Sequence, residues 1–326
     1  MTWQAFVFNL ALNKRAVMKI VALAGGVGGA KLLDGLANCL APEDLTAIVN
    51  TGDDFDFFGL RICPDLDTVC YTFAGISNPE TGWGRSAETW RVLENIKKLG
   101  GPDWFRLGDS DLATHLERTR RLKLGETLSC ITSHFCHSWG IRVNVIPMSD
   151  SIVRTIVFTD QLGPLPFQEY FVLHRCQPVV KSFSFEGIQA AQAAPKVLDL
   201  IYEADYVIFC PSNPWVSIDP ILNVNGICES LHGKKVIAVS PLIGGDAVKG
   251  PASKMFTEMG IKPSAIAVAD HYRSFITGFV LDHQDSYEKD QIYSWGIIPF
   301  ETDILMKDQG DRQRLANEIL TFCRDL

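Results

Sequence analysis

Short apolar runs alternate with longer amphipathic segments along most of this chain. Such apolar runs predict buried strands, and segments with apolar residues every three or four positions predict helices packed against them. The predicted strands are residues 19–24, 45–49, 142–146, 152–158, 205–209, 235–239, 264–268 and 277–281. The predicted helices are residues 29–40, 66–75, 86–98, 111–122, 127–138, 195–203, 221–232, 252–259 and 311–323.

This alternation of strands and helices predicts an α/β fold, Rossmann-like, with a mostly parallel sheet and helices on both faces. Residues 64–140 interrupt the alternation, because four helical patterns follow one another there without a strand pattern. We expect them to form a helical subdomain inserted at the carboxyl edge of the sheet. No long low-complexity linker divides the sequence, so we expect a single domain over residues 18–326.

Composition narrows the class of protein. The 326 residues carry a net charge of −8, which disfavours a nucleic-acid partner. The sequence contains no apolar run long enough to span a bilayer, so we expect no membrane association. Nine cysteines without a paired spacing, and no secretion signal, indicate a reducing, cytoplasmic location. We interpret residues 1–17 as a poorly ordered extension, with Met18 as the start of the ancestral domain.

The first apolar run ends in a glycine-rich turn, GGVGG, followed by Ala and Lys31. Gly25, Gly26, Gly28 and Gly29 leave the backbone amides bare, and the helix that follows adds a positive dipole end, so the turn is suited to a phosphate. A P-loop would need Ser or Thr after the lysine, and a dinucleotide fingerprint would need a third glycine where Lys31 stands. An NAD(P) site is therefore a weak alternative, and a turn that only packs a helix on the sheet is another.

Four loops carry aspartates at predicted strand ends or helix starts: NTGDD (50–54), PDLDT (64–68), LGDSD (107–111) and PMSD (147–150). In an open parallel sheet these loops meet in one crevice. Crowded carboxylates need a cation or a hydroxyl group between them, and Mg²⁺ binds one or two carboxylates together with phosphate oxygens. Each aspartate alone could equally be a helix cap. We expect His115, which lies near these loops, to pack inside the helical region.

The second half has two polar loops after predicted strands, CPSNP (210–214) and SPLIGG (240–245), followed by Lys249. Small polar side chains suit nucleoside or phosphate contacts, and a lysine can neutralise a diphosphate. The same loops could also be ordinary connections.

Seven blocks together resemble one family. They are GGVGGAKLLDGL, NTGDD, PDLDTVCY, LGDSDLATHL, PMSD, PSNPWVSIDPIL and SPLIGGDAVKGPASK. In this order they resemble the 2-phospho-L-lactate transferase (CofD) family over nearly the whole chain. The resemblance implies Mg²⁺-dependent transfer of a phospholactyl-type group from a guanosine-diphosphate adduct to the ribityl hydroxyl of the deazaflavin FO. The products would be a precursor of coenzyme F420 and GMP.

The motifs and the resemblance together suggest site residues. Those for the guanosine diphosphate are Gly25, Gly26, Val27, Gly28, Gly29, Lys31, Ser212, Asn213, Ser240, Gly244, Gly245 and Lys249. Those for FO are Asp54, Asp65, Trp83, Arg85, Asp109 and Ser110, with Trp83 as an aromatic wall for the flat ring. Asp65 and Asp67 would hold the metal and deprotonate the hydroxyl. Ser110 departs from the family pattern, in which many members carry Arg.

The sequence leaves an alternative function and the identity of the transferred acid open. A nucleotide-sugar-binding regulator without catalysis could use the same glycine turn. The sequence does not distinguish phospholactate, phosphoenolpyruvate and 3-phosphoglycerate as the transferred acid. The family resemblance suggests a homodimer.

Overall fold

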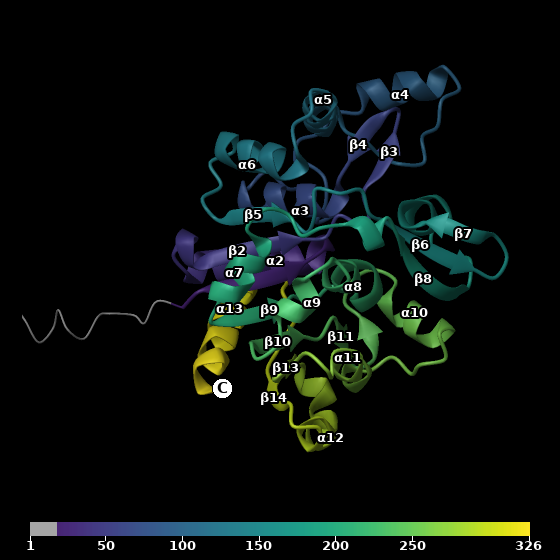
Figure 1. Ribbon diagram of the computed structural model, residues 1–326. Helices are drawn as coiled ribbons and strands as arrows, with labels where there is room; N and C mark the ends of the chain where they lie inside the picture. Colours follow the sequence, from purple (N-terminus) through teal and green to yellow (C-terminus); the bar gives the residue numbers. More distant parts are fainter. Residues whose placement is uncertain (1–17) are drawn as a thin grey trace, which may run out of the picture.

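A parallel seven-stranded sheet forms the centre of the protein (Figure 1). The computed structural model describes residues 18–326, so the extension assigned to residues 1–17 lies outside the described residues. The strand order is β5-β2-β1-β9-β10-β13-β14, and every neighbouring pair is parallel. The strands are β1 (Ile20–Ala24), β2 (Leu45–Val49), β5 (Asn144–Pro147), β9 (Tyr206–Phe209), β10 (Lys235–Val239), β13 (Gly278–Leu281) and β14 (Ile298–Glu301). This confirms the predicted fold class.

Each face of the sheet is covered by helices, because successive residues of a strand point to opposite sides. Along β1, Ile20 and Ala22 belong to one hydrophobic core, whereas Val21 and Leu23 belong to the other. The first core includes α2 (Gly26–Cys39), α3 (Pro64–Phe73), α6 (Leu128–Ser138) and α13 (Gln309–Asp325). The second includes α7 (Val197–Glu203), α8 (Asp219–Leu222), α9 (Ile227–Ser230), α10 (Ala252–Glu258), α11 (Ala265–His271) and α12 (Lys289–Ser294).

Helices α3 to α6 follow one another between β4 and β5, as predicted for residues 64–140. This run also contains α4 (Arg91–Lys98) and α5 (Asp109–Lys123). In Figure 1, α4 and α5 lie beside a hairpin of β3 (Phe55–Phe57) and β4 (Leu60–Ile62), away from the central sheet. A third, small hydrophobic core of Phe57, Ile62 and Leu107 joins the hairpin to this helical region.

A second, antiparallel sheet contains β6 (Arg154–Thr159), β7 (Gly163–Pro166) and β8 (Val180–Glu186). The strand predicted at residues 152–158 is β6, so it is not part of the central sheet. A π-helical turn, η2 (Glu169–Leu173), connects β7 to β8. The prediction did not include β7, β8 or β14, because their residues are largely half-exposed and lack a continuous apolar run.

The strand predicted at residues 264–268 is wrong, since these residues belong to α11. Ser264 caps this helix by accepting a hydrogen bond from the amide of Ala267, and a short apolar run does not by itself distinguish a strand from a buried helix. The helix predicted at residues 221–232 is divided into α8 and α9. The remaining short elements are η1 (Pro42–Asp44), η3 (Ile188–Ala190), η4 (Pro214–Ile218), β11 (Leu242–Ile243), β12 (Asp246–Ala247) and η5 (His283–Glu288).

The order of the strands places a crevice at the carboxyl ends of β1 and β9. From β1 the chain continues to β2 on one side, whereas β9 continues to β10 on the other side. Connections that diverge in this way leave a gap above the two strands, which is where ligands bind in open α/β sheets. Within residues 18–326, no helix has both the length and the apolar character needed for a bilayer span.

Candidate active site

The crevice starts at the turn between β1 and α2. Gly26 has a φ of 63°, and a Cβ at Gly28 would lie only 2.3 Å from the carbonyl oxygen of Pro211. Glycine is therefore required by backbone conformation and by the close approach of the loop after β9. The N-cap residue of α2 is Gly25, which has no side chain to cap the helix, and the first turn of α2 contains no acidic residue. Its N-terminal amides and dipole can therefore attract an anion.

Asp65 joins the glycine turn to two other elements. It lies in the first turn of α3, and its Oδ1 accepts a hydrogen bond of 2.7 Å from the amide of Gly26. Its Oδ2 accepts a hydrogen bond of 2.9 Å from Nδ2 of Asn50, which follows β2. Burial raises the pKa of Asp65 to about 6, although both hydrogen bonds act in the opposite direction. The carboxylate is therefore fixed in position, and its pKa lies close to neutral pH.

Asp53 lies close to Asp65 and has an unused oxygen. Its side chain is buried, and its Oδ1 has no hydrogen-bond partner among the described residues. Burial raises the pKa of Asp53 well above its ordinary value, and the charge of Asp65 raises it further. Two buried carboxylates that repel each other, one of them with a free oxygen, are the donor set that a divalent cation stabilises.

A buried network on α3 and α5 surrounds Asp67. Both oxygens of Asp67 accept hydrogen bonds from the guanidinium of Arg118, and His115 lies between this pair and Asp111. The hydroxyl of Tyr71 donates to Asp111 at 2.7 Å. Asp67, Asp111 and His115 offer ligand atoms that all lie within 4.8 Å of one another, so a divalent ion is compatible with this group. Arg118 already neutralises one of its carboxylates.

Aromatic side chains form much of the remaining wall. Trp83, from the loop between α3 and α4, lies at its edge and is 42% exposed. Trp104 and Phe105 come from the segment before α5. Phe167 and Phe171 stack on each other at a centroid distance of 5.4 Å and an interplanar angle of 7°. Flat apolar faces of this kind suit a planar ligand ring.

The loops of the second half of the chain complete the crevice. Ser212 Oγ donates to the carbonyl oxygen of Gly25 at 2.7 Å, and the Gly25 amide donates to the same Oγ. Asn213 caps η4 by accepting from two backbone amides. Lys249 donates to the carbonyl oxygen of Thr81, so the loop before α10 reaches the loop that carries Trp83.

These parts enclose one cavity of about 550 Å³, large enough for a nucleotide-sized ligand. Most of the predicted site residues line it. They are Gly25, Gly26, Val27, Gly28, Lys31, Asp65, Asp67, Trp83, Ser212, Asn213, Ser240 and Lys249.

Seven predicted residues do not line this cavity: Gly29, Asp54, Arg85, Asp109, Ser110, Gly244 and Gly245. The carboxylate of Asp109 instead accepts hydrogen bonds from Thr89 and from the amides of Arg91 and Val92, at the start of α4. These bonds hold the pKa of Asp109 below its ordinary value. Gly29 packs against β1, where a Cβ would lie 2.9 Å from the Cβ of Ala24.

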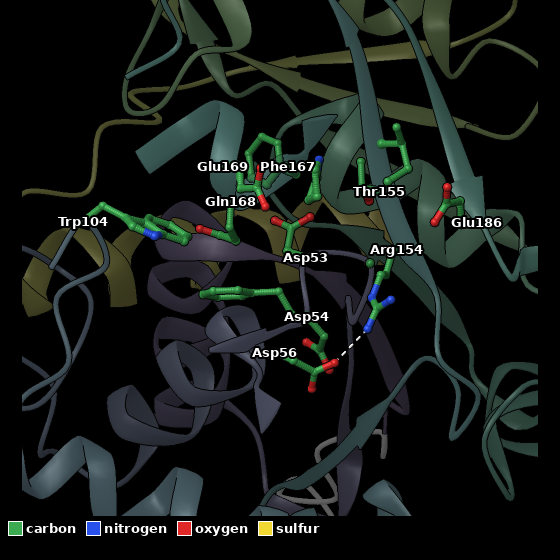
Figure 2. A pocket seen from close by; sticks show the side chains of 14 residues that line it. Asp53, Asp54, Asp56, Trp104, Arg154, Thr155, Phe167, Gln168, Glu169 and Glu186 are labelled. Atoms are coloured by element: carbon green, nitrogen blue, oxygen red, sulfur yellow. Dashed lines mark hydrogen bonds and ion pairs between the residues drawn. The ribbon is translucent and has the colours of Figure 1, made fainter. Parts of the chain in front are cut away.

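A second cavity of about 260 Å³ adjoins the first (Figure 2). The two cavities share Asp53, Trp104, Phe167 and Gln168. Asp54 lines the smaller one, and burial raises its pKa to about 7. Figure 2 also shows Arg154 paired with Asp56 at 2.8 Å.

Several cavity residues were not among the predicted site residues. Asp111 and His115 line the cavity, and their spacing of four residues places them on one face of α5. Arg118, three residues further along, lies on the same face but does not line the cavity. His115 does pack inside the helical region as expected, but it also lines the cavity. No sequence pattern indicated that residues between β7 and β8 line the cavity, because the tertiary fold brings them close to the glycine turn.

Comparison with known proteins identifies the family. The model of the family described as 2-phospho-L-lactate transferase CofD matches residues 20–317. A "Phosphoenolpyruvate transferase" of Streptomyces coelicolor is 41% identical over 316 residues, covering 95% of this chain and 99% of that protein. One from Thermobifida fusca is 45% identical over 282 residues, covering 82% and 88%.

A solved structure supports the fold alone. A UPF0052-family protein of Bacillus halodurans aligns with a TM-score of 0.61 at 14% identity, covering 93% of this chain and 98% of that one.

The family match over nearly the whole chain and the relatives above 40% identity indicate a transferase enzyme. The chain therefore belongs to the 2-phospho-L-lactate transferase (CofD) family.

Proposed function

We propose that this enzyme transfers a phosphoenolpyruvyl group from a guanosine-diphosphate adduct to the ribityl hydroxyl of FO, releasing GMP. The observation that carries the proposal is that one cavity contains a glycine-rich helix N-terminus, two buried carboxylates and an aromatic wall. These are the contacts needed for a diphosphate, a hydroxyl nucleophile and a planar ring. Among the acids left open by the sequence, phosphoenolpyruvate is favoured by the names of the two relatives.

The nucleotide would lie across the carboxyl ends of β1 and β9. Its diphosphate would rest on the N-terminal amides of α2, beside Ser212 and Asn213. Lys31 and Lys249 lie on the same wall, although each now donates to a backbone carbonyl oxygen. A bound diphosphate would offer both ammonium groups a stronger, charged acceptor.

Asp53 and Asp65 are the residues that would hold Mg²⁺. Asp53 Oδ1 is buried without a partner, and the mutual repulsion of the two carboxylates falls when a cation binds. Asp67 is less suited to this role, because its charge is already neutralised by the guanidinium of Arg118. Bound there, Mg²⁺ would neutralise charge on the diphosphate and on the leaving GMP.

The reaction requires a base for the attacking hydroxyl. We assign this role to Asp65, whose carboxylate is held in the cavity by hydrogen bonds from Gly26 and Asn50. The ribityl oxygen forms a bond to the β-phosphorus, and the bond from that phosphorus to the bridging oxygen breaks. The hydroxyl proton passes to Asp65, and GMP leaves with the electron pair. Asp67 would keep α3 in position through Arg118.

The deazaflavin ring would pack on the aromatic wall. Trp83 lies at the cavity edge, and Trp104 and Phe167 lie where the two cavities meet. Asp54, in the smaller cavity, would contact the acceptor there, whereas Arg85, Asp109 and Ser110 could do so only if the helical region moved inward.

The test is to incubate the protein with FO, Mg²⁺ and the guanosine-diphosphate ester of enolpyruvate. The expected result is stoichiometric release of GMP together with a fluorescent, more acidic deazaflavin product. Binding of the nucleotide without turnover would instead support a regulatory protein and would refute the proposal. Light scattering would test the proposed homodimer in the same preparation.

A further inference from the structure

Arg175 is an unpaired cation on the wall of the large cavity. Four basic side chains other than histidine line this cavity: Lys31, Arg106, Arg175 and Lys249. Lys31 and Lys249 donate to backbone carbonyl oxygens, and the guanidinium of Arg106 lies 4.3 Å from the ring centre of Trp90. Arg175 is exposed, and among the described residues its side chain has no hydrogen bond, ion pair or ring contact. Its guanidinium is therefore available to a ligand.

The backbone at Arg175 is in an unfavourable conformation for a side-chain-bearing residue. Arg175 has a φ of 50° and Cys176 a φ of 55°, whereas most positions with positive φ in the described chain are glycine. The turn is held by hydrogen bonds from the amide of His174 to Glu169 and from the amide of Cys176 to Tyr170, which is fully buried. Non-glycine residues keep this left-handed backbone conformation where the surrounding structure enforces it, often at functional sites. Of the described non-glycine residues with positive φ, Arg175 alone lines the cavity.

The position of Arg175 relates it to the rest of the site. Phe167, Phe171 and Arg175 are spaced four residues apart and all line the cavity. The same segment contacts α10, because Lys254 donates to the carbonyl oxygen of Pro178 at 3.1 Å. Helix α10 follows directly on Lys249 and the rim of the nucleotide site. Arg175 thus lies on the wall that runs from the stacked aromatic pair to the basic rim.

We propose that Arg175 is the specificity residue that binds the carboxylate of the transferred acid. This inference rests on the proposed function. The donor differs from GDP by an ester that carries a carboxylate, and a guanidinium fork matches a carboxylate through two parallel hydrogen bonds. Such a contact selects an acid-bearing donor over a neutral ester, and the amides of α2 cannot supply this discrimination because they bind the phosphates that both donors share.

The experiment compares two donors in three proteins. The donors are the enolpyruvate ester of GDP and the isopropyl ester of GDP, which lacks the carboxylate. The proteins are wild type, Arg175→Gln and the matched control Arg106→Gln, which changes the other arginine of the cavity. Binding of each donor is measured by calorimetry, and turnover is followed as GMP release with FO and Mg²⁺.

Wild type is expected to prefer the carboxylate donor by roughly 10- to 100-fold, the effect of one charged hydrogen-bonded contact. Arg175→Gln should lose this preference and handle the isopropyl ester as wild type does, whereas Arg106→Gln should keep the preference. Equal losses for both donors in Arg175→Gln, or an effect confined to the KM of FO, would overturn the inference. Failure of every protein to release GMP would refute the proposed function only, because the binding preference is measured separately.

A glycine at the same position separates recognition from folding. Arg175→Gly relieves the left-handed conformation, so its unfolding temperature should equal or exceed that of wild type while its donor preference is lost. A large fall in the unfolding temperature would show that Arg175 supports the fold, and would contradict the assignment.

Discussion

Replacing Asp65 by Asn should abolish turnover while leaving the protein folded and able to bind GDP. The substitution removes the proposed base and a proposed metal ligand but keeps the shape of the side chain. Loss of a positioned general base lowers kcat by about 10²- to 10⁴-fold. The amides of α2 that would bind the diphosphate are unchanged, so the affinity for GDP should stay within about threefold of wild type.

The effect on stability follows from two opposing contributions. Asp65 accepts hydrogen bonds from two donors, the Gly26 amide and Asn50 Nδ2, and Asn can accept only one of them without facing a donor with its own NH₂ group. One buried unsatisfied donor costs about 1–3 kcal/mol. In the other direction, the pKa of Asp65 rises from 3.8 to about 6 on folding, so the buried charge destabilises the folded state at pH 7.5. At 1.36 kcal/mol per pKa unit, replacing that charge by a neutral amide should increase the free energy of unfolding by about 3 kcal/mol.

Because these contributions nearly cancel, the unfolding temperature should move by less than about 5 °C. The assays are GMP release with FO, calorimetric titration with GDP, and thermal unfolding followed by circular dichroism. Asp109→Asn is the matched control, since Asp109 also begins a helix but lies outside the cavity lining, and it should keep turnover within about threefold. An Asp65→Asn enzyme that turns over at near wild-type rate would refute the assignment of base and metal ligand.

Three further changes test the carboxylates, the turn and the buried ion pair. Because burial raises the pKa of Asp53 well above its ordinary value of 3.8, the folded state holds a proton that the unfolded state releases as the pH rises through that ordinary value. The contribution of Asp53 to metal-free stability should therefore fall as the pH rises above 3.8. Mg²⁺ should raise the unfolding temperature more at pH 8 than at pH 5, and Asp53→Asn should weaken both effects. Gly28→Ala should lower stability by about 1–3 kcal/mol and weaken GDP binding, measured by denaturant unfolding and calorimetry, because the new Cβ meets the backbone of Pro211. Arg118→Leu should lower the free energy of unfolding by about 3–5 kcal/mol, because it leaves Asp67 buried and unpaired. In a double-mutant cycle measured by denaturant unfolding, adding Asp67→Asn should recover much of that loss, and strictly additive losses would contradict the pairing.

The sequence by itself determined the central sheet and the glycine turn. The apolar runs at β1, β2, β9 and β10 are buried on both faces, so their composition reports their environment directly. The GGVGG turn is likewise local, because the requirement for glycine at Gly26 comes from its own φ. The alternation of strands and helices then restricts the topology, and the site was placed at the carboxyl edge of the sheet for the same reason.

Only the tertiary structure decided how the carboxylates are used. Asp65 and Asp67 look alike in PDLD, yet one accepts from the glycine turn and the other is paired with Arg118, 51 residues further along the chain. Asp109, which the sequence predicts as an FO-binding residue, accepts hydrogen bonds from the first amides of α4. Arg175 lacks any motif, and reaches the cavity through the fold of β7, η2 and β8. Partners distant in sequence set burial, charge and hydrogen bonding, and these quantities decide whether an acidic or basic side chain binds a ligand or supports the fold.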